Sequence, residues 1–297
     1  MSTVNFKNEG ASGDLDLFLV DEQWLSSHLS DPGVVLIDTR SANDYWQGHL
    51  PGARHLDTSL FSHYDTSPAG LTSLVSQYEW IFSLLGVSRD QRVVFYENRS
   101  DSRAARGAWL LEYLGHEAVS ILDGGLSALR QTALTTEAPA YAPFRFKATP
   151  VAQAVIGHAE ILTRRDDSKL QILDTRRATE YFGEEIRANR AGAIPGASHL
   201  DYVDNIDVSG RFKPASDLRA AFSSLGLQPE REVAVYCGGG VRAAHTYFAL
   251  KIAGYPTPRN YTGSWGEWGN REDLPVERPV RNQAPTASSA QAVAAKA

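Results

Sequence analysis

The sequence contains a single cysteine, Cys237, and a single methionine at its first position. One cysteine excludes an intramolecular disulfide framework and a thiolate-rich metal site. No stretch is long and apolar enough to span a bilayer, and the N-terminal residues lack the apolar segment of a signal peptide. We therefore expect a cytoplasmic protein without a membrane partner, and nothing in the sequence predicts a metal site or a cofactor.

Basic residues are also few, with 29 Lys and Arg against 35 Asp and Glu, and the formal net charge is −6. This balance argues against a nucleic-acid-binding protein. Hydrophobic residues make up 42% and charged residues 22% of the chain, which is ordinary for a globular protein. Because 297 residues exceed the usual size of one domain, two domains with separate cores are expected.

The lone cysteine follows a short apolar run. Residues 233–236 are of the β-branched kind that forms a buried parallel strand, and three glycines follow Cys237. Side-chain spacing predicts a helix over residues 242–252, with Gly254 as its stop signal. The stretch is therefore predicted to form a strand, a tight loop and a helix, with the thiol at the carboxyl end of the strand.

Such a loop favours a negative charge on the cysteine. Glycines let the backbone fold around one point with its N–H groups turned inward. The neighbouring helix N-terminus adds partial positive charge, which favours a thiolate or another anion. A lone cysteine beside an apolar run is most often a small buried side chain, but three consecutive glycines would weaken such packing. The pattern therefore indicates a nucleophilic thiolate.

The sequence contains an internal repeat of one unit. An apolar run followed by Asp-Thr-Arg, a Pro-Gly-Ala segment, a Phe-Ser-containing helix end and a second apolar strand recur in the same order. The paired positions are 34–40 with 170–176, 51–53 with 195–197, 82–87 with 222–227, and 93–97 with 233–237. Strands alternating with helices predict an α/β fold of two tandem domains, each a parallel sheet flanked by helices on both faces. Sites in such sheets lie at the carboxyl ends of strands.

Composition sets the expected boundaries of these domains. We predict a first domain at 17–138, a Pro- and Ala-rich linker at 139–150, a second domain at 151–280 and a disordered tail at 281–297. Residues 1–16 are expected to form a loose arm. The second copy carries a polar insertion around 183–190, which is most simply a surface loop.

Three chemistries use a cysteine in this setting. A tyrosine-phosphatase-type loop needs its arginine one position farther from the cysteine than Arg242, so this loop is too short for phosphate and fits a cysteine carrying one extra sulfur. A Cys–His hydrolase needs a base within reach, but His245 lies inside the predicted helix and is expected to face solvent or the core. Sulfur transfer remains, in which inward N–H groups stabilise a persulfide anion on Cys237.

Over residues 18–278, the doubled unit and the segment Cys-Gly-Gly-Gly-Val-Arg-Ala resemble the two-domain rhodanese-type sulfurtransferases. The resemblance implies two rhodanese-like domains with the active site in the cleft between them. Only the second would be catalytic, because Glu97 stands in the first copy where Cys237 stands in the second. It also implies transfer of a sulfane sulfur from 3-mercaptopyruvate or thiosulfate through Cys237 to cyanide, a thiol or a carrier protein.

The resemblance assigns binding of the persulfide and substrate to the residues of the cysteine loop. These are Gly238, Gly239, Gly240, Val241, Arg242 and Ala243. The loop departs from the family, because Gly239 replaces the serine of mercaptopyruvate-using members and the lysine of thiosulfate-using ones, and Arg242 replaces a threonine. The donor therefore stays open. So does an alternative function, a persulfide relay or sensing module that serves a protein partner with little small-molecule turnover.

A second departure concerns the cation that holds the donor. Family members often carry an arginine where this chain has Phe182, and Arg187, Arg190 or Arg242 could take its place. Alternatively, Arg187 and Arg190 belong to a solvated charge cluster with nearby glutamates. We expect Arg242 to brace the loop through an ion pair with Asp174. Structural roles are also expected for Asp38, Arg40, Asp174, Arg176, Trp265 and Trp268.

Overall fold

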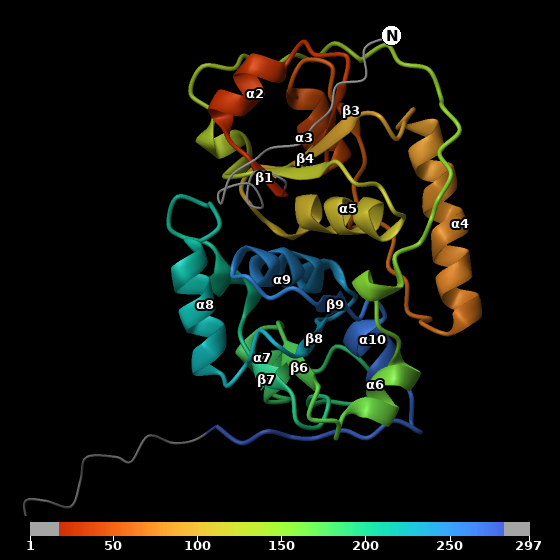
Figure 1. The fold of residues 1–297 in the computed structure, drawn as a ribbon, viewed down its shortest axis with the longest axis vertical. Helices are drawn as coiled ribbons and strands as arrows, with labels where there is room; N and C mark the ends of the chain where they lie inside the picture. Colours follow the sequence, from red (N-terminus) through yellow and green to blue (C-terminus); the bar gives the residue numbers. More distant parts are fainter. Residues whose placement is uncertain (1–17, 282–297) are drawn as a thin grey trace, which may run out of the picture.

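A computed structural model describes residues 18–281 of the chain. The predicted loose arm at 1–16 and nearly all of the predicted tail at 281–297 lie outside the described residues. Two parallel sheets, each covered by helices, confirm the predicted α/β class (Figure 1). No helix between residues 18 and 281 combines the length and apolarity that a membrane crossing requires.

The first domain is built on a five-stranded parallel sheet with the order β1-β5-β4-β2-β3. Its strands are β1 (Leu19–Val20), β2 (Val34–Asp38), β3 (Arg54–His55), β4 (Arg92–Tyr96) and β5 (Val119–Leu122). Its helices are α2 (Glu22–His28), α3 (Ala42–Gln47), α4 (Pro68–Leu84), α5 (Ser102–Tyr113) and the 3₁₀ turn η1 (Gly125–Ala128). Asp21 caps α2, because its carboxylate accepts a hydrogen bond from the Trp24 amide at 2.8 Å.

The second domain repeats this plan on a four-stranded parallel sheet with the order β7-β6-β8-β9. Its strands are β6 (Leu170–Asp174), β7 (Ser198–His199), β8 (Glu232–Tyr236) and β9 (Pro258–Asn260). Its helices are α6 (His158–Arg164), α7 (Ala178–Tyr181), α8 (Ala215–Ser224), α9 (Val241–Ile252) and α10 (Ser264–Trp268), with 3₁₀ turns η2 (Ala152–Ala154) and η3 (Tyr202–Asn205). A single parallel bridge between Val155 and Asn260 stands where β1 stands in the first domain.

The repeat extends to individual atoms of the buried ion pairs. At the end of β2, Arg40 pairs with Asp38 at 2.6 Å and donates to the Gly48 carbonyl. At the end of β6, Arg176 pairs with Asp174 at 2.6 Å and donates to the carbonyl of Gly192. Each pair holds the chain after its strand against the following loop, which confirms the structural role predicted for these four charged residues.

The two domains meet through α5 and α9, which lie against each other in the middle of the molecule (Figure 1). Buried side chains on both helices belong to one apolar cluster that extends across the two domains. Because α5 follows the loop of Glu97 and α9 follows the loop of Cys237, this packing directs both loops toward the boundary between the domains. The segment 139–150, predicted to be a linker, has no helix or strand, and its buried Phe146 packs against Phe82 of the first domain.

Candidate active site

The segment around Cys237 has the predicted strand, loop and helix. β8 ends at Tyr236, Cys237 follows at its carboxyl end, and α9 begins at Val241. Gly240 caps α9 with a left-handed backbone (φ 79°), and a Cβ atom there would lie 2.7 Å from the Thr262 carbonyl oxygen. Only glycine therefore fits the last position of the loop.

The loop backbone turns its carbonyl groups outward and an amide toward the sulfur. The carbonyls of Cys237, Gly238 and Gly240 accept hydrogen bonds from Trp265 N (2.9 Å), Gly266 N (2.8 Å) and Asn260 Nδ2 (3.1 Å), respectively. Across a trans peptide the next N–H points the opposite way, so the amides of the following residues face the inner side of the loop. The Gly240 N–H lies 3.1 Å from the Cys237 Sγ.

Ser264 is a residue of the site that sequence reasoning missed. Its hydroxyl accepts a hydrogen bond from the Cys237 amide at 3.0 Å and lies 3.9 Å from the Sγ. Its backbone adopts a positive φ of 52°, and strain of this kind concentrates at functional sites. The sequence signal for Ser264 was its place between Gly263 and Trp265. The sequence predicts a role in this region only for Trp265 and Trp268, as structural residues. Both tryptophans are buried in the core, as expected.

Cys237 itself is only 1% exposed. The segment of the first domain around Tyr64 covers the loop. A Cβ atom on Gly239 would lie 3.2 Å from the Tyr64 ring, and one on Gly266 would overlap it. The tyrosine therefore occupies the space that a serine side chain would need at position 239.

Thr66 fixes this covering segment to the second domain. Its amide and its hydroxyl donate to the Glu267 carboxylate at 2.9 and 2.6 Å. His158 lies against the same carboxylate at 2.9 Å. Leu60 and Tyr64 are 72% and 51% exposed, so the part of the segment before its anchor is open to solvent on its outer side.

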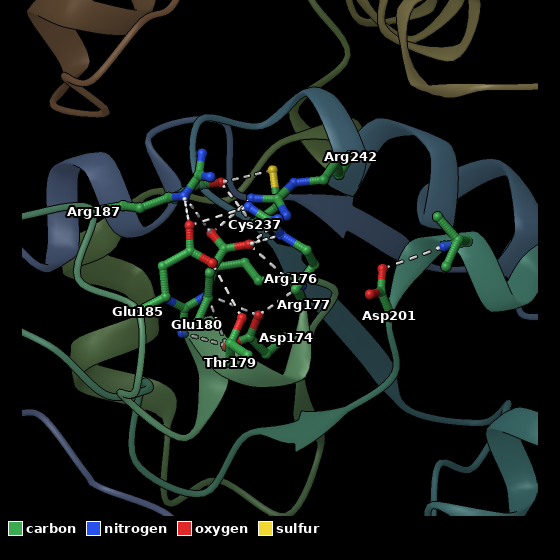
Figure 2. A network of polar contacts seen from close by, with 12 residues as sticks. Asp174, Arg176, Arg177, Thr179, Glu180, Glu185, Arg187, Asp201, Cys237 and Arg242 are labelled. Carbon is green, nitrogen blue, oxygen red and sulfur yellow. Dashed lines mark hydrogen bonds and ion pairs between the residues drawn. The ribbon is translucent and has the colours of Figure 1, made fainter.

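The predicted ion pair between Arg242 and Asp174 is wrong. Arg242 instead binds the buried Glu180 carboxylate with two hydrogen bonds of 2.6 and 2.9 Å (Figure 2). The reason is that Arg176, two residues along the same strand end, already occupies both oxygens of Asp174. Glu180 on α7 thus braces the first turn of α9, and Arg242 still supports the loop as expected.

Burial raises the pKa of Glu180, but the hydrogen bonds and charge of Arg242 outweigh this and lower it to about 2. The folded value lies below the ordinary value of 4.5, so the stabilisation is complete above pH 4.5 and is lost as the pH falls toward 2. We expect the stability difference between wild type and Glu180→Gln to shrink over this acidic range. Denaturant unfolding at a series of pH values measures it, and a difference that stays constant would contradict the assignment.

The three arginines proposed to hold a donor have different surroundings. Arg187 is 54% exposed on its side chain, pairs with Glu185 at 2.6 Å, and lies 4.0 Å from the Glu180 carboxylate that Arg242 binds (Figure 2). Arg190 donates instead to the carbonyl oxygens of Trp268, Gly269, Arg271 and Leu274. Its guanidinium therefore ties down the chain after α10. Phe182, at the position of the family arginine, packs under Arg281.

Two titratable side chains near the domain boundary, His245 and Glu97, are buried. His245 is fully buried and stacks on Phe212, and burial lowers its pKa to about 4. Of the two orientations predicted for this side chain, solvent or core, the structure has the core. Glu97 accepts a hydrogen bond from the Ala104 amide, and burial with the charge of Asp101 raises its pKa to about 8. Among residues 18–281, no cluster of three His, Cys, Asp or Glu side chains could hold a metal ion.

Comparison with known proteins agrees with this geometry. The rhodanese-like domain family matches residues 21–132 and again residues 158–271. The chain belongs to the rhodanese family. The sulfur carrier protein TtuD of Thermus thermophilus is 32% identical (88% of this chain, 96% of the relative), and the thiosulfate sulfurtransferase of Azotobacter vinelandii is 33% identical (87% and 96%).

A solved structure also matches this rhodanese-family chain over most of its length. The crystal structure of SseA from Escherichia coli, a 3-mercaptopyruvate sulfotransferase by its description, matches with a TM-score of 0.73 and 29% identity. The match covers 84% of this chain and 98% of that one. The tandem rhodanese fold is therefore confirmed, and the protein is a sulfurtransferase of the thiosulfate and 3-mercaptopyruvate type.

Proposed function

We propose that the enzyme moves a sulfane sulfur through a persulfide on Cys237. The observation that carries the proposal is the Gly240 amide, 3.1 Å from the Sγ, in a loop where the carbonyls of Cys237, Gly238 and Gly240 bind groups outside the loop. Inward amides stabilise negative charge on sulfur as an oxyanion hole stabilises it on oxygen. The residues proposed to surround the persulfide are Gly238, Gly239, Gly240, Val241, Arg242 and Ala243.

The proposed reaction has two displacements at sulfur. The Cys237 thiolate attacks the outer sulfur of the donor, so a new S–S bond forms. The C–S bond of 3-mercaptopyruvate or the S–S bond of thiosulfate breaks, and its electron pair leaves with pyruvate enolate or sulfite. Cyanide, a thiol or a carrier protein then attacks the outer sulfur, and the electron pair of the persulfide bond returns to Cys237 as thiolate.

Two experiments on one preparation test this function. Purified protein is incubated with 3-mercaptopyruvate or thiosulfate, the mass of the Cys237 peptide is measured, and turnover to cyanide is followed. One added sulfur with rapid turnover on either donor supports the enzyme and identifies the donor. No added sulfur with either donor would overturn the proposal.

The second candidate is a relay that delivers the persulfide to a protein partner. It is supported by one relative, TtuD of Thermus thermophilus, which is a sulfur carrier protein by its name. In the same experiment the relay predicts a loaded Cys237 peptide with negligible turnover to cyanide. Fast turnover would exclude it.

Arg187, rather than Arg190, is proposed to hold the anionic group of the donor. Arg187 is exposed near the loop, whereas the guanidinium of Arg190 is bound to backbone carbonyls. Loss of a charged hydrogen bond costs about 1.5–3 kcal/mol, so Arg187→Ala should raise KM for the donor about tenfold or more. Melting temperature should stay unchanged in this variant and fall in the matched Arg190→Ala. Equal KM values for Arg187→Ala and wild type would refute the assignment.

A further inference from the structure

One guanidinium at the domain boundary has no hydrogen-bond partner among residues 18–281. Arg106 lies on α5 of the first domain and is 0% exposed. Its Nε and both of its terminal nitrogens are buried without a hydrogen-bond acceptor. A guanidinium carries five N–H donors, and leaving them unsatisfied in the protein interior costs free energy that natural sequences rarely retain without use. Among residues 18–281, no hydrogen-bonded carboxylate balances the charge of Arg106.

The neighbours of Arg106 narrow down which anion could balance its charge. The guanidinium is 4.8 Å from the centre of the Trp109 ring, which supplies a cation–π contact on one side. The Tyr78 hydroxyl on α4 is also buried without a partner. Burial lowers the pKa of Arg106, and the charges of Tyr78 and Cys237 oppose that shift. Cys237 is the one of these two groups that the proposed reaction makes anionic.

Arg106 and Cys237 lie on either side of the packed helices α5 and α9. Arg106 is on α5, Cys237 ends the strand whose loop leads into α9, and α5 and α9 contact each other across the domain boundary. The other guanidinium near the sulfur, that of Arg242, is already bound to the Glu180 carboxylate. The positive charge of Arg106 is not neutralised in this way.

We infer that Arg106 supplies the positive charge opposite the anionic sulfur of Cys237, as thiolate before loading and as persulfide after it. The first domain, which lacks the cysteine, thereby contributes a positioning charge to the catalytic sulfur of the second. This inference deepens the proposed function and rests on it. In the protein interior, a buried positive charge stabilises a nearby anion more than it would in water.

The test is a titration of the Cys237 thiol. It needs no sulfur donor, so its result can contradict this inference even if sulfur transfer itself is confirmed. The ultraviolet absorbance of the thiolate is followed against pH in wild type, Arg106→Met and Arg106→Lys, with Cys237→Ser as the blank. Because the chain has one cysteine, the signal has one source. The groups that face this pair are Tyr78 of α4 and Arg242 of α9, and both are unchanged in all variants.

We expect the midpoint of thiol ionisation to rise by about one pH unit or more in Arg106→Met and to stay near the wild-type midpoint in Arg106→Lys. Melting temperature should not fall in Arg106→Met, because the methionine replaces a buried guanidinium that lacks hydrogen bonds. Arg106→Gln serves the same purpose if the methionine variant does not accumulate. Arg92→Met is the matched control, because Arg92 lies at the start of β4, at the end of the strand away from the Glu97 loop. The Cys237 thiol of this variant should titrate as in wild type.

Two results would overturn the inference. One is a midpoint in Arg106→Met equal to that of wild type. The other is an equal shift in the methionine and lysine variants, which would assign the effect to packing and not to charge. Loss of persulfide loading with an unperturbed titration counts against the inference as well, since it would place the effect of Arg106 elsewhere in the reaction.

Discussion

Replacing Cys237 by serine is expected to abolish persulfide formation and to lower turnover by on the order of 10³-fold or more. The described site offers no second thiol, because Cys237 is the single cysteine of the sequence. A serine hydroxyl is a much weaker nucleophile than a thiolate and has no neighbouring base to activate it. Mass measurement of the peptide that contains residue 237, after incubation with donor, should show one added sulfur in wild type and none in Cys237→Ser.

The serine variant should keep its fold, which makes it a clean control. Its hydroxyl can accept the Gly240 amide that contacts the sulfur in wild type, and the site is too confined for other rearrangement. Thermal unfolding should therefore lie close to that of wild type. Sulfur found on another residue, or turnover preserved in Cys237→Ser, would disprove the persulfide mechanism.

Replacing Arg242 by alanine is expected to destabilise the protein by about 3 kcal/mol, because it leaves the buried Glu180 carboxylate without its main partner. Glu180 has 1% of its side chain exposed. Its remaining contacts are longer: the Arg177 amide at 3.2 Å and the guanidinium groups of Arg177 and Arg187 at 3.4 and 4.0 Å. Denaturant unfolding measures the loss. Donor loading should also slow, since the first turn of α9 loses its brace.

A double-mutant cycle separates bracing from donor binding. The double variant Arg242→Ala/Glu180→Ala should lose less stability than the sum of the single variants, because the two side chains form one pair. Arg187→Ala, which removes a more distant and exposed cation, should lose little. Unchanged stability of Arg242→Ala together with a large rise in KM would transfer Arg242 to the donor site.

The local structure around Cys237 follows from the sequence almost residue by residue. Apolar β-branched residues before the cysteine form β8, and the helix begins at Val241, one residue before the predicted start. The repeat predicts the two sheets because each unit encodes its own strands and turns. Arg40 and Arg176 pair with carboxylates two residues away, and such neighbours can be read from one strand end.

Contacts between distant segments were not predictable in the same way. The partner of Arg242 depends on the position of α7 relative to α9, and competition by Arg176 for Asp174 decides the outcome. The cover formed by Tyr64 comes from the other domain and has no periodic pattern. Arg190 illustrates the same limit, since the direction of its side chain depends on where the chain returns after α10.

The cover over the cysteine has a consequence for the resting enzyme. A sulfur that is 1% exposed, beneath a segment anchored through Thr66 and Glu267, meets peroxide or bulky reagents only when that segment departs. Oxidation of a thiolate depends on access as well as on charge. While the segment is in place, this arrangement therefore shields the single cysteine from oxidation.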